Sequence, residues 1–75
     1  MQSIDVIFHT NTQLDKDQFD AVAKQIYQIP GVVEFKQLPN KPKFILAAYH
    51  ASETKALSIL NKITRLGFQA RIIEI

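Results

Sequence analysis

The side chains best suited to chemistry in this chain are its two histidines and a short run of aspartates. His9 ends a strand-like segment, and Asp15 and Asp17 follow the next loop. Imidazole and carboxylate groups are metal ligands, so these three residues are the candidate ligands of a weak metal site. Their spacing matches no recognised ligand set. We therefore predict no metal centre and no cofactor.

The second histidine does not join that site. His50 ends the segment expected to form the third strand, which runs antiparallel to the first. His9 and His50 are thus expected at opposite ends of the strands, along two opposite borders of the sheet. Six or seven residues at ~3.3 Å each separate these edges by about 20 Å. One ion cannot bridge that distance.

The sequence carries none of the motifs that catalysis usually requires. It has no cysteine, which excludes disulfides and thiolate metal sites. Its two glycines, Gly31 and Gly67, each follow a helical segment and are better explained as helix ends than as a phosphate loop. No serine or other nucleophile lies in the sharp strand-to-helix turn that exposes a catalytic nucleophile in hydrolases. We predict that the chain is not an enzyme.

Composition bounds the protein class and the kinds of partner. The 75 residues are 47% hydrophobic, enough for the core of one domain over 1–75. Nine lysines and arginines against seven acidic residues, spread along the chain, make nucleic acid an unexpected partner. No stretch approaches the length of a membrane span, and the start does not resemble a signal peptide. The expected location is the cytoplasm.

Periodicity predicts six elements with recognisable ends. Asp15 with Gln18 forms a capping box, and Pro30-Gly31 ends the first helix. Ser52 is the expected cap of the second helix, and Gly67 its expected stop. A turn at 39–42 contains two prolines. The expected elements are strand 4–9, helix 15–29, strand 32–38, strand 43–49, helix 52–66 and strand 71–75.

This order predicts an α+β fold of the ferredoxin-like type. Two β-α-β halves place four antiparallel strands in the order 4-1-3-2, with both helices on one face of the sheet. The second helix is expected to turn Leu57, Leu60, Ile63 and Thr64 toward the sheet, with Ala56 and Ile59 beside them. The predicted core comprises Val6, Phe8, Phe19, Val22, Ile26, Val33, Phe35, Leu60, Ile63 and Phe68.

Two short patterns at the helix ends resemble a known family. Ile29-Pro30-Gly31-Val32-Val33 and Leu66-Gly67-Phe68-Gln69-Ala70 are similar to the heavy-metal-associated domain of copper chaperones and metal-transporting ATPases. That family binds metal through a Cys-x-x-Cys loop. Counting back from Gly31, its cysteines would fall near Asp15 and Gln18. The resemblance implies the family's fold, and the replaced cysteines imply that its metal function is lost.

The face of the sheet without helices is the expected interaction surface. If Val6 and Phe8 point inward, Ile7 and His9 point outward. On the third strand either Ile45, Ala47 and Tyr49 or Phe44, Leu46 and Ala48 point outward. Each choice leaves contiguous apolar side chains exposed, which often marks a contact surface. The residues expected to bind a protein partner or a second copy are Ile7, His9, Tyr49 and Ile73.

Three other functions are compatible with part of this sequence: its candidate ligands or its order of strands and helices. A divergent metal carrier would use His9 with Asp15 and Asp17. An RNA-recognition motif has the same element order, and Phe8, Phe44 and Tyr49 supply aromatics, but the glycines of that motif are absent. A ligand-binding regulatory domain of the ACT type also shares the topology, although loop 10–13 lacks the usual glycine. A small ligand is therefore not excluded.

Overall fold

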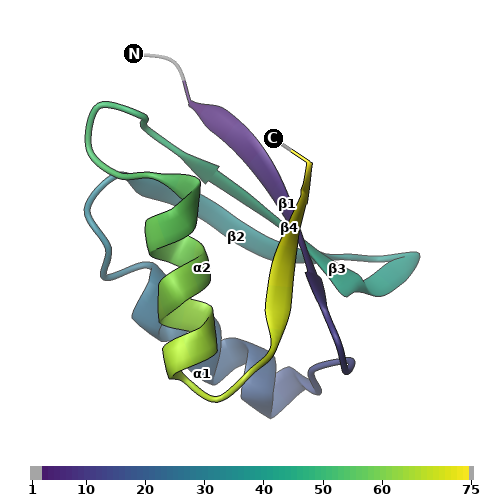
Figure 1. Cartoon of the computed structure of the whole chain (residues 1–75). Helices are drawn as coiled ribbons and strands as arrows, with labels where there is room; N and C mark the ends of the chain where they lie inside the picture. The colour runs from purple at the N-terminus through teal and green to yellow at the C-terminus, as the bar shows by residue number, and fades with distance from the viewer. Residues whose placement is uncertain (1–2, 75) are drawn as a thin grey trace.

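The computed structural model describes residues 3–74 and contains four strands and two helices in the predicted order (Figure 1). The predicted last residue of the final strand, Ile75, lies outside the described residues. The elements are β1 (Ile4–Thr10), α1 (Lys16–Ile26), β2 (Val32–Leu38), β3 (Lys41–Tyr49), α2 (Ala56–Arg65) and β4 (Ala70–Glu74).

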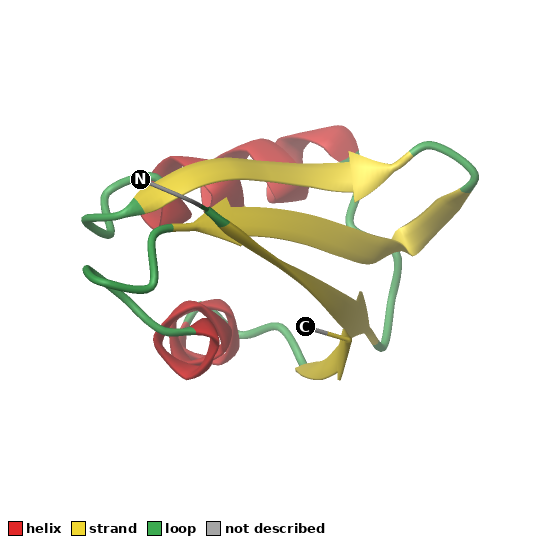
Figure 2. Ribbon diagram, turned by 90° about the horizontal axis from the view of Figure 1, so that it is seen from above, coloured by secondary structure: helices red, strands yellow, loops and turns green. Residues whose placement is uncertain are grey.

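The strands form one antiparallel sheet in the order β2-β3-β1-β4, which confirms the predicted order read from its other edge. Figure 2 shows the molecule from above, with α2 seen end-on to the left of β4 and α1 behind β2. α1 contacts β2 and α2, and α2 contacts β4. The fold is the ferredoxin-like arrangement expected from the sequence.

The first helix begins as predicted and ends early. The Asp15 carboxylate accepts a hydrogen bond from the Gln18 amide nitrogen (2.7 Å), and the Gln18 side chain accepts one from the Asp15 amide nitrogen (3.0 Å), which confirms the capping box. The helix ends at Ile26, not at 29. Gln28 and Ile29 donate instead to carbonyls three residues back, because Pro30 disfavours a helical conformation in the residue before it.

The second helix begins later than expected, with its N-cap three residues beyond Ser52. Ser52 lies in a turn, and Lys55 occupies the N-cap position without a side-chain hydrogen bond. The intervening segment folds over Gly31: the His50 amide donates to the Gly31 carbonyl at 2.8 Å, and Glu53 and Thr54 donate to the His50 carbonyl. Because of this packing, the residues that we expected in the first helical turn form a turn before the helix instead.

The strand after the hairpin begins earlier than predicted, at Lys41, and includes Pro42. The last β1–β3 pair is His9 with Phe44, and Pro42 lies beyond it. At Pro42, β3 is therefore no longer paired with β1. A residue without an N–H group is tolerated at such a position.

The core lies between the helices and one face of the sheet and matches most of its prediction. Val6, Phe8, Ile26 and Ile63 are fully buried, and Val22 and Phe35 nearly so. Phe19, Leu60 and Phe68 are partly buried against this cluster.

Val33 was wrongly assigned to the core and is 51% exposed. The pairing register between β2 and β3 shifts between Val32 and Glu34. Such a bulge inserts one unpaired residue and breaks the alternation of faces. Val32 packs against the core in place of Val33.

The buried side of α2 is also rotated from the prediction. Ala56, Ile59 and Ile63 are buried, whereas Leu57 is 60% exposed and Thr64 is exposed. The helix begins late and contacts β4. The residues that it buries are therefore Ala56, Ile59 and Ile63, which lie on one face at helical spacing.

Candidate functional site: the open sheet face

The β1–β3 register decides which side chains occupy the face without helices. Val6 pairs with Ala47 and Phe8 with Ile45, and all four are fully buried. Directly opposed residues share a face. Ile45, Ala47 and Tyr49 therefore face the helices, and the alternative set, Phe44, Leu46 and Ala48, faces outward.

Three apolar side chains occupy the centre of this outward face. Ile7 pairs with Leu46, and His9 pairs with Phe44. Ile7, Phe44 and Leu46 are half-buried by their neighbours in the sheet. We call Ile7, Phe44 and Leu46 the open-face strip.

Tyr49 does not belong to the open face and was wrongly placed there. It pairs with Ile4 and Val32 and is only 5% exposed. The sequence permitted either register for this strand, because β3 is apolar on both faces.

At the β4 edge, Arg71 pairs with His9 and therefore shares the open face. Ile72 pairs with Phe8 and packs against the core. The register shifts between Ile7 and Phe8, and Ile73 falls in this irregularity. Ile73 is 46% exposed, so it adds apolar surface at this edge.

His9 contacts Phe44 at one end of the face. The ring centroids are 5.1 Å apart at an interplanar angle of 62°, an edge-to-face contact. The Lys41 ammonium lies 5.4 Å from the centroid of the Phe44 ring, within the range of a cation–π interaction. Sequence analysis missed this grouping, although the alternation of β1 and β3 would have indicated it once the register was known.

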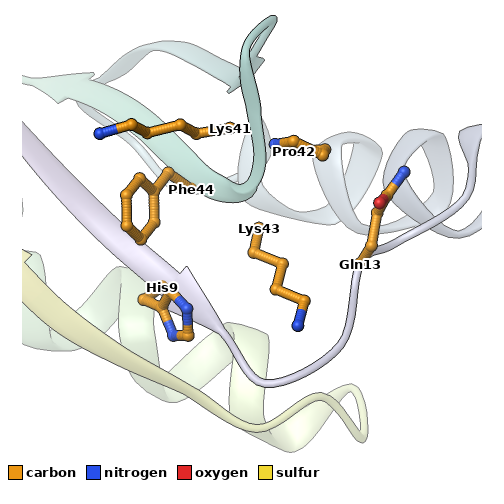
Figure 3. A pocket seen from close by; sticks show the side chains of 6 residues that line it. All are labelled: His9, Gln13, Lys41, Pro42, Lys43 and Phe44. Atoms are coloured by element: carbon orange, nitrogen blue, oxygen red, sulfur yellow. The ribbon is translucent and has the colours of Figure 1, made fainter.

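These residues border a hollow of about 430 Å³ (Figure 3). His9 comes from β1, Gln13 from the following loop, and the rest from the start of β3. We call it the Phe44 hollow. Its lining residues are His9, Gln13, Lys41, Pro42, Lys43 and Phe44.

The predicted metal candidates do not assemble into a ligand set. Asp15 is engaged in capping α1, and Asp17 lies in the first turn of that helix. Across residues 3–74 no three His, Asp or Glu side chains gather closely enough to hold an ion. His9 and His50 lie at opposite edges, because His9 pairs with Phe44 whereas Tyr49, next to His50, pairs with Ile4.

The aromatics of the RNA-recognition alternative are also divided between the faces. Phe8 and Tyr49 are buried toward the helices, and of the three only Phe44 faces outward. Stacking of successive bases needs several aromatics on one face. In the described part of the chain, no helix has the length and hydropathy of a membrane span.

Comparison with known proteins shows similarity in fold. No protein-family model and no curated protein matches the sequence. Among solved structures, oxidized MerP from Ralstonia metallidurans CH34 superposes with a TM-score of 0.81 at 11% identity, over 97% of this chain and 100% of MerP.

Two copper-related domains are similar as well. The N-terminal domain of a potential copper-translocating P-type ATPase from Bacillus subtilis, in its Cu(I)-loaded state, gives a TM-score of 0.81 at 13% identity, over 97% of this chain and 90% of that domain. The yeast copper transporter domain CCC2A gives a TM-score of 0.79 at 20% identity, over 93% of this chain and 94% of that domain. At these identities the likeness establishes a shared fold, the ferredoxin-like fold of heavy-metal-associated domains.

Proposed function

We propose that this chain is a non-catalytic interaction domain of the cytoplasm that keeps the shape of a heavy-metal-associated domain without its metal site. The open sheet face is its contact surface, and its occupant is a protein partner or a second copy. The observation that carries the proposal is the open-face strip, which no helix covers in the described part of the chain.

The strip has the layout of a contact surface. Its apolar centre spans the two middle strands, and Ile73 extends the apolar surface at the β4 edge. Charged residues surround this centre: Lys36 pairs with Leu46 from the β2 side, and Arg71 lies opposite His9. An apolar centre with a polar rim is the usual anatomy of a protein interface.

The missing cysteines argue against the family's own chemistry. Cu(I) sites depend on soft thiolate ligands, and this sequence has none. The Gln18 side-chain oxygen accepts a hydrogen bond from the Asp15 backbone N–H, and the Asp15 carboxylate accepts one from the Gln18 backbone N–H, so both side chains are engaged at the helix start. A role in contact therefore accounts for this fold without cysteines better than a role in metal transfer.

The test substitutes the centre of the strip and compares it with a matched position elsewhere. Leu46→Glu places a charge on the open face, and Leu57→Glu places the same charge on the exposed side of α2. Sedimentation at high protein concentration measures self-association. Capture from a native lysate, read by mass spectrometry, measures partner binding.

We expect association or capture by the wild type and by Leu57→Glu, and its loss in Leu46→Glu, with circular dichroism showing that both variants fold. A strictly monomeric wild type whose captured partners are all retained by Leu46→Glu would contradict the proposal.

A further inference from the structure

We propose that the Phe44 hollow binds a small organic acid with a planar apolar body. This site shares Phe44 with the open-face strip, but Ile7 and Leu46 do not line it, and its lysines lie outside the strip. Its size falls within the range of small-molecule sites, ~300–1,000 Å³.

The walls of the hollow are tied together before any ligand binds. Thr10 is 1% exposed, and its hydroxyl lies 2.8 Å from the Thr12 carbonyl oxygen and 3.2 Å from that of Lys43. The Gln37 side-chain amide donates to the carbonyls of Leu14 and Pro42, each at 3.1 Å. These bonds join the loop after β1 to the start of β3. A pre-formed site lowers the entropy cost of binding.

The lining chemistry selects charge and shape together. Lys41 and Lys43 supply two cationic groups, and none of the six lining residues, all in the described part of the chain, is acidic. The rings of Phe44 and His9 and the ring of Pro42 supply apolar walls (Figure 3). An anionic group attached to a flat apolar body would satisfy both features at once.

One polar atom of this cluster has no partner. Within the described residues, His9 Nδ1 is shielded from solvent and makes no hydrogen bond. Buried polar side-chain atoms in folded proteins are nearly always paired. Because this nitrogen is shielded, a ligand in the hollow reaches it only after the His9 ring turns, so the charge and shape of the lining, and not this atom, indicate the ligand.

The probe is 2-naphthoate, with 2-naphthamide as its neutral analogue and inorganic phosphate as an anion without a ring. Binding is followed by backbone amide shifts in two-dimensional NMR. We expect saturable shifts at His9, Gln13, Lys43 and Phe44 with 2-naphthoate. Because 2-naphthamide lacks the charged contact and phosphate lacks the ring, each should bind about tenfold more weakly than 2-naphthoate or not at all.

Three variants locate the site. Lys43→Met and Phe44→Leu should each weaken 2-naphthoate by about tenfold, since one removes a charge and the other the ring. Lys24→Met removes an exposed lysine from α1 and should leave binding unchanged. The amide spectra also report whether each variant is folded.

Equal binding of 2-naphthoate and 2-naphthamide would overturn the proposal, because it would indicate general apolar adhesion. Shifts centred on Ile7 and Leu46, no saturation, or equal weakening by Lys24→Met would overturn it as well.

Discussion

The two faces of this sheet are built from alternate residues of the same strands, yet they differ in burial. Toward the helices, Val6, Phe8 and Ile45 are fully buried. On the other side, their neighbours Ile7, Phe44 and Leu46 remain partly exposed to solvent. The covered face supplies the folding energy, and the open face is left available for contact. One apolar strand can therefore serve stability on one side and recognition on the other.

The largest expected effect tests the covered face. Phe8→Ala removes a fully buried ring and should lower the free energy of unfolding by about 3–5 kcal/mol. Phe44→Ala on the open face should cost only about 1 kcal/mol, because part of that ring is already in water. Urea denaturation of both variants measures the difference. Equal losses would mean that the two faces are not energetically distinct.

A smaller effect tests the packing of the β3–α2 connection over Gly31, on the covered side of the sheet. Gly31 has φ +95°, and a Cβ there would lie 2.7 Å from the Glu53 Cβ, whereas Gly67 has φ +100° with no atom within 4 Å of its Cβ position. Gly31→Ala should destabilise by about 2 kcal/mol or more, and Gly67→Ala by about 1 kcal/mol, since the left-handed conformation alone costs ~1–2 kcal/mol. Thermal denaturation ranks the two, and a reversed ranking would contradict the packing of the β3–α2 connection over Gly31.

The next effect concerns the start of the helix that covers β2. Asp15→Ala removes the side-chain acceptor of the capping box and should cost about 1 kcal/mol. Asp15→Asn keeps an oxygen acceptor and should cost less. Chemical denaturation of the pair checks this. Equal stability of Asp15→Ala and the wild type would show that the cap contributes nothing measurable.

The smallest effect on stability tests the open face. Leu46→Thr shortens an apolar side chain on a half-exposed strand position, where Thr is a good strand former, and should change the free energy of unfolding by about 0.5 kcal/mol. The same variant should weaken self-association or partner capture. A large loss of stability would assign Leu46 to folding and contradict its proposed role in contact.

Local signals were the part of the fold that the sequence predicted well. The Asp15–Gln18 capping box, the bounds of β2 and the left-handed Gly67 after α2 depend on residues adjacent in the chain. The strand order followed from element order and right-handed connections. The helix-end patterns around Gly31 and Gly67 indicated a fold that similarity to MerP and to a yeast copper transporter domain then supported.

The errors arose where a distant contact overrode a local preference. Ser52 is a good cap by type, but the connection over Gly31 holds its segment in a turn. Val33 alternates correctly with Phe35, but a bulge moves it outward. Tyr49 was placed on the wrong face because β3 is apolar on both sides and its register has no local signal.

The sequence by itself determined the element types, their order and the absence of a thiolate site, because each depends on composition or on neighbours within one or two turns. Only the tertiary structure decided which apolar residues face outward and that His9, Phe44 and Lys41 meet. Those facts depend on strand register and bulges. A shift of one residue inverts a strand's two faces, and the energy that selects the register comes from packing across the whole sheet.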